Sequence, residues 1–196
     1  MQSTFVFDIY QTLVDYPNWE QLKKTDPHLQ SIIQKYKNDK IAMKKALLPE
    51  FDKAIVAGKI YGIQTENAKK VLEQLASIGQ LAIFSTGTEN VIRTMLEQSG
   101  LIYLFDNQKL LVPCERMGNT SKKEPLAYSL LEKYLAGIGF AMKTYTDDDG
   151  EMASAAADSG IKAVVYHFDR KSKLIEPKKE ERIIRISNLK QILDSV

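Results

Sequence analysis

The sequence predicts an α/β protein with a doubly wound, mostly parallel β-sheet. Residues 4–7 and 80–85 are almost continuously apolar and have the length of strands that are buried on both faces. Between residues 81 and 166, such segments alternate with amphipathic helical patterns, as expected when helices connect parallel strands. A run of helical patterns directly after the first strand indicates an insertion into this core.

Composition limits the possible functions. The chain of 196 residues is long enough for one domain of average size, or for a core with a small insertion. Its hydrophobic content of 44% and charged content of 27% are ordinary for a globular protein. The formal net charge of +2 offers no electrostatic basis for binding nucleic acid or a membrane surface. We therefore expect neither as a partner.

The single cysteine, Cys114, cannot form an internal disulfide, which favours a reducing compartment. Neither His28 nor His167 forms a recognisable pair with it, so a buried, inert thiol is favoured over a nucleophile. The N-terminus lacks the charged and then apolar pattern of a secretion signal, and no stretch approaches a membrane span of about 18 apolar residues. These features predict a cytoplasmic protein.

The first strand indicates where a reactive group lies. Residues 4–7 are apolar, β-branched or aromatic, and Asp8 follows at the point where the strand should end. In open α/β sheets, ligands bind outside the carboxyl ends of the strands. Asp8 is therefore well placed to act on a substrate, and Thr12 is expected on the loop beside it.

Residues 15–61 interrupt the alternation of strands and helices. They contain four helical patterns, at residues 19–24, 28–37, 40–48 and 49–57. We therefore expect a core of residues 1–14 and 62–196 and a helical insertion of residues 15–61. The alternative is that these helices simply pack on the core.

The strand at residues 80–85 also ends in polar residues. A helix over residues 65–78, capped by Thr65, is expected to precede it. Ser85, Thr86 and Gly87 lie at its end, where hydroxyl and backbone N–H groups suit an anion. The same residue types also form turns and helix caps, so this strand end is weak evidence when taken alone.

A lysine and a carboxylate run follow further along the chain. After a helix at residues 90–98 and an irregular stretch at 105–113, Lys122 precedes Pro125, which suits the first turn of a helix. By itself, this pattern is simply a helix start with a surface lysine. The remaining expected elements are a strand at 141–145, a helix at 153–160, strands at 161–166 and 182–186, and a helical turn at 189–193.

The strand at residues 141–145 leads into three consecutive carboxylates. Asp147, Asp148 and Asp149 repel one another, and a bound cation is a common remedy for such repulsion. A solvated acidic turn is the alternative.

Four of these stretches, in this order, resemble the motifs of the haloacid dehalogenase (HAD)-like hydrolase superfamily. Its first motif, an apolar strand with Asp-x-Asp-x-Thr, is similar to the region of Asp8 and Thr12. A strand ending in Ser or Thr matches Ser85, and a Lys at a helix start matches Lys122. An acidic motif followed by Ala-x-x-x-Gly matches the carboxylate run. The resemblance implies a Rossmann-like core with an inserted helical cap that helps to select the substrate.

The resemblance also implies a role for each matched residue. Asp8 would be the nucleophile that forms a covalent aspartyl intermediate. Ser85 and Lys122 would neutralise the transferring group, because carboxylates and a phosphate otherwise repel one another. Thr12 and the backbone N–H groups of Thr86 and Gly87 would contact the substrate.

A magnesium site follows from the same resemblance. Mg²⁺ would be held by Asp8, by the main-chain carbonyl of Tyr10 and by Asp147 or Asp148. Met152 stands where the superfamily often has a second acid, and Glu151, one residue earlier, is the substitute that the sequence offers.

Tyr10 departs from the phosphatase pattern, in which the second Asp acts as general acid and base. A phenol with a reference pKa of about 10 is a poor proton donor. The Asp-x-Tyr pattern is similar instead to 2-haloacid dehalogenases, where Asp attacks carbon, halide leaves unprotonated and no metal is required. Those enzymes commonly have Gly in place of Gln11, and Ser or Asn in place of the carboxylate run.

We expect a Mg²⁺-dependent phosphatase that acts on a small, anionic, phosphorylated metabolite, because the carboxylate run outweighs Tyr10. The alternatives are a metal-independent, 2-haloacid dehalogenase-type hydrolase, an enolase-phosphatase-like enzyme, and a catalytically reduced binding protein on the same fold. The sequence leaves open the substrate and the oligomeric state.

Overall fold

The structure, a computed structural model, describes residues 1–118, 120–167 and 181–194. Its centre is a six-stranded sheet in the order β5-β4-β1-β6-β7-β8. Every neighbouring pair in this sheet is parallel, which confirms the predicted doubly wound fold. The strands are β1 (Gln2–Phe7), β4 (Gln80–Ser85), β5 (Leu111–Pro113), β6 (Phe140–Asp147), β7 (Val164–His167) and β8 (Ile183–Ile186).

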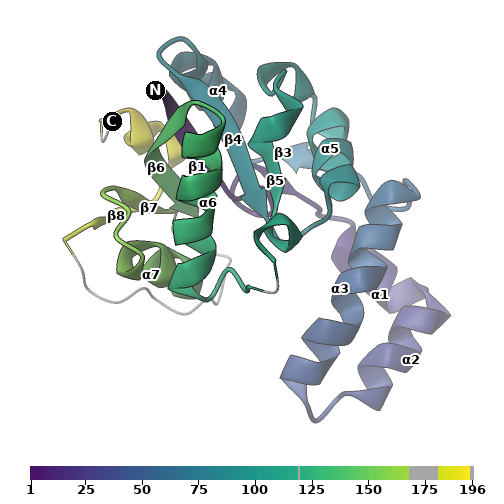
Figure 1. Cartoon of the computed structure of the whole chain (residues 1–196). Coiled ribbons are helices and arrows are strands. Elements are labelled where there is room, and N and C mark those ends of the chain that lie inside the picture. The colour runs from purple at the N-terminus through teal and green to yellow at the C-terminus, as the bar shows by residue number, and fades with distance from the viewer. Residues whose placement is uncertain (119, 168–180, 195–196) are drawn as a thin grey trace.

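Helices cover both faces of the sheet because successive strand residues point to opposite sides (Figure 1). Phe5 and Phe7 pack in one core with α4 and α5, whereas Val6 and Phe84 pack in the other with α6 and α7. The helices are α4 (Ala68–Ala76), α5 (Glu89–Gln98), α6 (Pro125–Gly137) and α7 (Gly150–Asp158). Short 3₁₀ helices are η1 (Ile102–Leu104), η2 (Gln108–Leu110), η3 (Cys114–Met117) and η4 (Leu189–Asp194).

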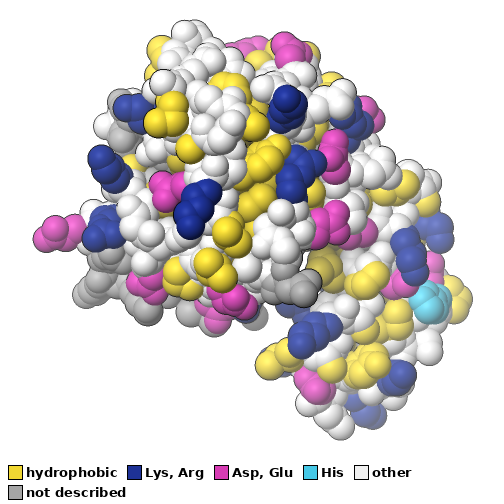
Figure 2. Space-filling view, in the orientation of Figure 1, with side chains coloured by type: hydrophobic (Ala, Val, Ile, Leu, Met, Phe, Trp, Pro, Cys, Tyr) yellow, Lys and Arg dark blue, Asp and Glu magenta, His cyan; other side chains and the backbone are white. Residues whose placement is uncertain are grey.

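A helical segment lies between β1 and α4. Its two connections to the core pair as short antiparallel strands, β2 (Val14–Asp15) and β3 (Ile63–Gln64). Between them lie α1 (Trp19–Thr25), α2 (Pro27–Lys35) and α3 (Lys40–Val56). These helices form a lobe beside the sheet, at the lower right of Figures 1 and 2. None of the helices in the described ranges is long and apolar enough to cross a membrane.

The prediction of four helical pieces in this segment was wrong, because α3 continues through Pro49. Proline removes one backbone N–H donor and disfavours a helix interior. The buried side chains of Phe51, Ala54 and Ile55 follow it on the same helix, and their packing offsets that cost. Tertiary contacts therefore override the local signal of Pro49.

Three other local expectations were also wrong. The Thr65 hydroxyl donates to the Thr12 carbonyl at 2.8 Å instead of capping a helix, and α4 begins after Asn67, whose φ is +67°. The helix predicted over residues 65–78 also ends early, at Ala76, and Ile78 beyond it is 63% exposed. The stretch expected to be irregular contains β5, a strand of only three residues that pairs with β4. So short a strand carries no periodic signal.

Candidate active site

Three of the predicted polar strand ends meet at the middle of the sheet. Asp8 follows β1, Ser85 ends β4 and Asp147 ends β6, and these strands are adjacent. The chain leaves β1 towards β4 on one side, and later returns to β6 on the other side. Such a switch point is where ligands bind in open α/β sheets.

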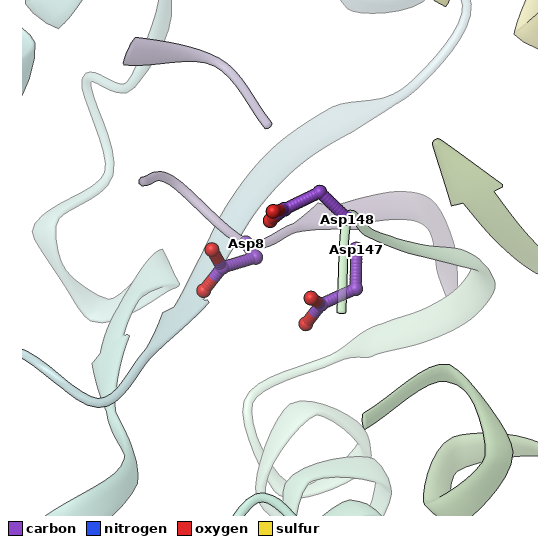
Figure 3. Close-up of side chains that lie close together, drawn as sticks. All are labelled: Asp8, Asp147 and Asp148. Carbon is purple, nitrogen blue, oxygen red and sulfur yellow. The ribbon is translucent and has the colours of Figure 1, made fainter. Parts of the chain in front are cut away.

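Asp8, Asp147 and Asp148 form a carboxylate cluster at this point (Figure 3). Each offers one carboxylate oxygen, and these oxygens lie within 4.8 Å of one another. All three side chains are buried, with Asp147 1% and Asp148 4% exposed. The sequence left open whether Asp147 or Asp148 lies at the site, and the structure places both there.

Lys122 is buried against the cluster and partly compensates its charge. Its Nζ donates to Asp8 Oδ1 at 2.7 Å and to Asp147 Oδ2 at 2.9 Å. It also lies 5.6 Å and 5.5 Å from the ring centroids of Phe84 and Tyr145, within range of cation–π attraction. Burial lowers the pKa of Lys122, but the charges of Asp147 and Asp8 outweigh it and raise that pKa overall. Lys122 is therefore a fixed cation.

The two neighbouring acids of the cluster differ in their hydrogen bonds. Asp147 accepts from Lys122 and the Tyr145 hydroxyl on Oδ2, and from the Asp149 backbone N–H at 2.9 Å on Oδ1. Asp148 accepts at Oδ1 from the Thr12 hydroxyl at 3.1 Å, its one hydrogen-bond donor among the described residues. Asp147 therefore uses most of its lone pairs within the protein, including one that binds Lys122. Asp148 has more lone pairs left for another ligand.

Burial and the charges of neighbouring carboxylates raise the pKa values of Asp8 and Asp148. Desolvation raises the pKa of Asp8 most; Lys122 lowers it and Asp147 raises it, and the result is about 6. The pKa of Asp148 is raised well above its ordinary value by burial, and then by the charges of Asp147 and Asp8. Fully ionised, three carboxylates and one ammonium leave two negative charges in excess. An all-oxygen donor set with this charge fits a hard divalent cation such as Mg²⁺.

This excess charge predicts a pH-dependent stability in EDTA. Since the pKa of Asp8 is raised from 3.8 to about 6, the folded protein binds more protons than the unfolded chain in that interval. The contribution of Asp8 is therefore fully present below about pH 4, and is lost as the pH rises through about 6. Urea unfolding between those values should show a fall in stability, and Asp8→Asn should reduce that fall by an amount on the order of 2–3 kcal/mol, leaving the part that Asp148 contributes. The same slope in both proteins would contradict this assignment.

The end of β4 supplies hydrogen-bonding groups beside the cluster. Ser85 is buried, and its Oγ accepts from the Gly87 backbone N–H at 3.3 Å. A Cβ at Gly87 would lie 3.2 Å from Val91 Cγ1, so a side chain there would crowd the start of α5. Thr86, by contrast, is exposed. The predicted group of Ser85, Thr86 and Gly87 therefore forms a turn directly after the strand.

The Tyr10 side chain contacts the helical segment. Its ring centroid lies 5.0 Å from that of Phe51 on α3 and 6.4 Å from that of Tyr16. Burial, and then the charge of Asp15, raises the pKa of Tyr10 to about 12. The phenol therefore stays protonated and is held among aromatic rings.

The remaining candidate residues lie outside the cluster. The Glu151 carboxylate binds the Lys123 ammonium, and Asp149 caps α7 by accepting from the Glu151 backbone N–H at 2.9 Å. Cys114 is buried, and its Sγ donates to the Thr120 carbonyl at 3.6 Å. Burial raises the pKa of this thiol, which makes it a weak nucleophile.

Sequence reasoning missed Tyr145 as part of the site. It lies two residues before Asp147 on β6, so both side chains project from the same side of the strand. The two-residue spacing of a β-strand was the sequence signal that could have identified Tyr145. Its fully buried hydroxyl donates to Asp147, and its ring contacts Tyr128 at a centroid distance of 4.9 Å.

The structure combines a parallel sheet, acids after β1 and β6, a hydroxyl at the end of β4 and helices inserted after β1. Solved structures of HAD-like hydrolases share its fold. Among solved structures, L-2-haloacid dehalogenase from Xanthobacter autotrophicus has a TM-score of 0.69 and 15% identity, covering 98% of this chain and 97% of the dehalogenase. The same enzyme with chloropropionic acid covalently bound has a TM-score of 0.67 and 14% identity, with coverage of 98% and 97%.

A HAD family hydrolase from Deinococcus radiodurans, with bound phosphate and sodium, has a TM-score of 0.62 and 14% identity and covers 98% of this chain and 95% of that chain. No protein-family model matches the sequence, and no curated protein matches it. The likeness therefore establishes the fold. Solved structures with this fold include one with covalently bound chloropropionic acid and one with bound phosphate and sodium.

Proposed function

We propose that this protein is a cytoplasmic, Mg²⁺-dependent phosphohydrolase that acts on a small phosphorylated metabolite. The observation that carries the proposal is the buried cluster of Asp8, Asp147 and Asp148 beside Lys122. The two excess negative charges of the ionised cluster would be neutralised by a divalent cation. A phosphoryl group bound at the site would also need cationic partners. The phosphate in the Deinococcus radiodurans hydrolase supports this choice.

In this proposal Asp8 attacks phosphorus. An aspartyl-phosphate bond forms as the bond from phosphorus to the leaving oxygen breaks, and water then hydrolyses the intermediate to restore the carboxylate. Lys122 holds Asp8 in place and offsets the charge of the phosphoryl oxygens. Ser85 and the backbone N–H groups after β4 donate hydrogen bonds to those oxygens.

The cation would be held by Asp8, by Asp148 and by the main-chain carbonyl of Tyr10, and would supply Lewis-acid stabilisation of the phosphoryl group. The open lone pairs of Asp148 favour it over Asp147 as a ligand. Thr12 orients Asp148, and Asp147 orients Lys122. Helices α1 to α3 would act as the cap that selects the substrate.

Tyr10 limits the leaving group. Because its pKa is about 12 and its ring is packed against Phe51, it is a weak acid for protonating a departing alkoxide. We therefore expect phosphate esters or anhydrides whose leaving groups depart as stable anions. p-Nitrophenyl phosphate is a suitable first substrate.

Calorimetry with Mg²⁺ tests the cluster directly. We expect the wild type to bind Mg²⁺, and Asp148→Asn to bind at least about tenfold more weakly, because a carboxylate ligand is lost. Asp149→Asn is the matched control: it removes the neighbouring charge outside the cluster, and Asn retains a helix-capping oxygen. Equal binding by both variants, or no binding by the wild type at millimolar Mg²⁺, would overturn the metal site.

A second candidate function is hydrolysis of a 2-haloacid. Tyr10 favours it, since a halide leaves without a proton and needs no general acid. The Xanthobacter autotrophicus dehalogenase, with its covalently bound chloropropionic acid, supports it through the shared fold. Chloride release from 2-chloropropionate that persists in EDTA would favour this function. Phosphate release that requires Mg²⁺ would favour the first.

A further inference from the structure

Gln98 connects the core to both segments that lead into and out of the helical segment. It is the last residue of α5, on the core. Its Oε1 accepts from the Tyr16 hydroxyl at 3.0 Å and from the Gly62 backbone N–H at 3.1 Å. Its Nε2 donates to the carbonyls of Ile55 at 3.2 Å and Ile60 at 3.4 Å.

These four hydrogen bonds use the full capacity of the side-chain amide, which has two acceptor lone pairs and two N–H donors. A carboxylate of the same shape could accept from Tyr16 and Gly62, but its other oxygen would face two carbonyl oxygens. An apolar side chain would leave all four partners without this contact. The amide is therefore matched to the site by its chemistry as well as by its shape.

The surrounding contacts restrict the same junction. Val14 pairs with Gln64 and Asp15 with Ile63 in the β2–β3 ribbon, and Gln64 Nε2 donates to the Ser99 carbonyl at 2.7 Å. A Cβ added at Gly62 would lie 2.6 Å from Val14 Cγ1, so the two connections touch closely. Hinges need connections that can change their backbone angles, and this junction has little room to do so.

The junction also continues to the catalytic loop. Tyr16, held by Gln98, packs its ring edge-on against Phe51 at a centroid distance of 5.4 Å. The ring of Phe51 also lies 5.0 Å, centroid to centroid, from that of Tyr10, and Tyr10 is two positions after Asp8 in the chain. The position of α3 is thereby tied to the loop that carries the nucleophile.

We propose that Gln98 is a positioning residue that clamps the two connections, so that helices α1 to α3 keep one orientation relative to the strand ends. The substrate would then bind against helices α1 to α3 in a fixed orientation, without a closing movement of these helices over the site. The clamp itself is independent of the reaction; only its effect on turnover rests on the proposed phosphohydrolase function.

Hydrogen exchange measures the clamp without reference to activity. In Gln98→Glu we expect amides of residues 55–62 to exchange about tenfold faster, because the carboxylate cannot donate to the carbonyls of Ile55 and Ile60 and repels them. Tyr16→Phe removes a single bond and should give a smaller increase. Gln74→Glu on the exposed side of α4 is the matched control with the same charge change. Amides of β1 and β4 should be unchanged in all variants.

Unchanged exchange in both Gln98→Glu and Tyr16→Phe would overturn the clamp. Equal acceleration throughout the sheet would also overturn it, because that is the mark of a merely structural residue.

Spin-label distances test the orientation. Ser31→Cys on α2 and Lys133→Cys on α6 are exposed sites for the labels, in a Cys114→Ala background. We expect one narrow distance distribution in the otherwise wild-type protein and a broad one after Gln98→Glu. Two populations before that substitution would show a swinging segment and overturn the proposal.

Kinetics supply the link to function. With p-nitrophenyl phosphate, Gln98→Glu should raise KM about tenfold while Gln74→Glu leaves it unchanged, because the pocket wall is no longer fixed. An unchanged KM in an active enzyme would overturn the role in substrate positioning. A wild type without phosphatase activity would count against the proposed function alone, since exchange and distances still decide the clamp.

Discussion

Replacing Asp8 by Asn is expected to reduce turnover at least about 10⁴-fold and to leave the fold intact. The amide cannot form the proposed covalent intermediate, and removal of the nucleophile from known covalent enzymes costs at least this much. The fold should persist because Asn is isosteric and Lys122 keeps Asp147 as its partner. The measurement is kcat for release of p-nitrophenol, with circular dichroism to verify the fold.

Ser3→Ala is a control on the same strand, five residues away from Asp8. Its rate should stay within about twofold of the wild type, because Ser3 is only half-buried and removing its hydroxyl changes nothing at the carboxylate cluster. Residual activity of Asp8→Asn above a few per cent would exclude Asp8 as the nucleophile. Because haloacid hydrolysis would use the same nucleophile, loss of chloride release in Asp8→Asn would be equally informative if that activity is found.

Replacing Lys122 by Met is expected to destabilise the protein by about 3–5 kcal/mol in EDTA, the cost of leaving buried charges unpaired. Lys122 is 1% exposed and ion-paired to Asp8 and Asp147 at 2.7 Å and 2.9 Å. Methionine fills a similar volume without the charge, so the loss reports on electrostatics more than on packing. The free energy of unfolding in urea is the quantity to measure.

Lys123→Met is the matched control at the neighbouring position. Lys123 pairs with Glu151 at the surface, and its side chain is 54% exposed. Its loss should change the free energy of unfolding by less than about 1 kcal/mol, as for exposed ion pairs. Similar effects of the two substitutions would show that Lys122 contributes no more than a surface lysine, and would remove the electrostatic basis of the site.

The strand ends could be predicted from sequence because their signals are local. The strand at residues 80–85 has the predicted bounds, and Asp8 lies directly after β1 as expected. An apolar run followed by a polar residue needs only a few neighbouring positions to be recognised. The carboxyl ends of parallel strands then meet at one edge, which brought Asp8, Ser85 and Asp147 to a common place.

Local signals failed where distant contacts compete with them. Pro49 predicted a helix end, but the burial of residues after it keeps α3 continuous. Thr65 has the composition of a helix cap, but its hydroxyl bonds to Thr12, which is 53 positions away in the chain. Propensity is worth a fraction of a kcal/mol per residue, so packing and a long-range hydrogen bond can outweigh it.

The sequence by itself determined the fold class, the nucleophile candidate and the set of acids around it, because periodicity and residue type can be recognised within a short stretch of sequence. Only the tertiary structure distinguished Asp147, which accepts three hydrogen bonds from Lys122, Tyr145 and Asp149, from Asp148, which accepts one from Thr12. It alone revealed Gln98, whose partners lie 36 to 82 positions away. Hydrogen-bond partners depend on which chain segments meet in space, and a one-dimensional pattern does not record that.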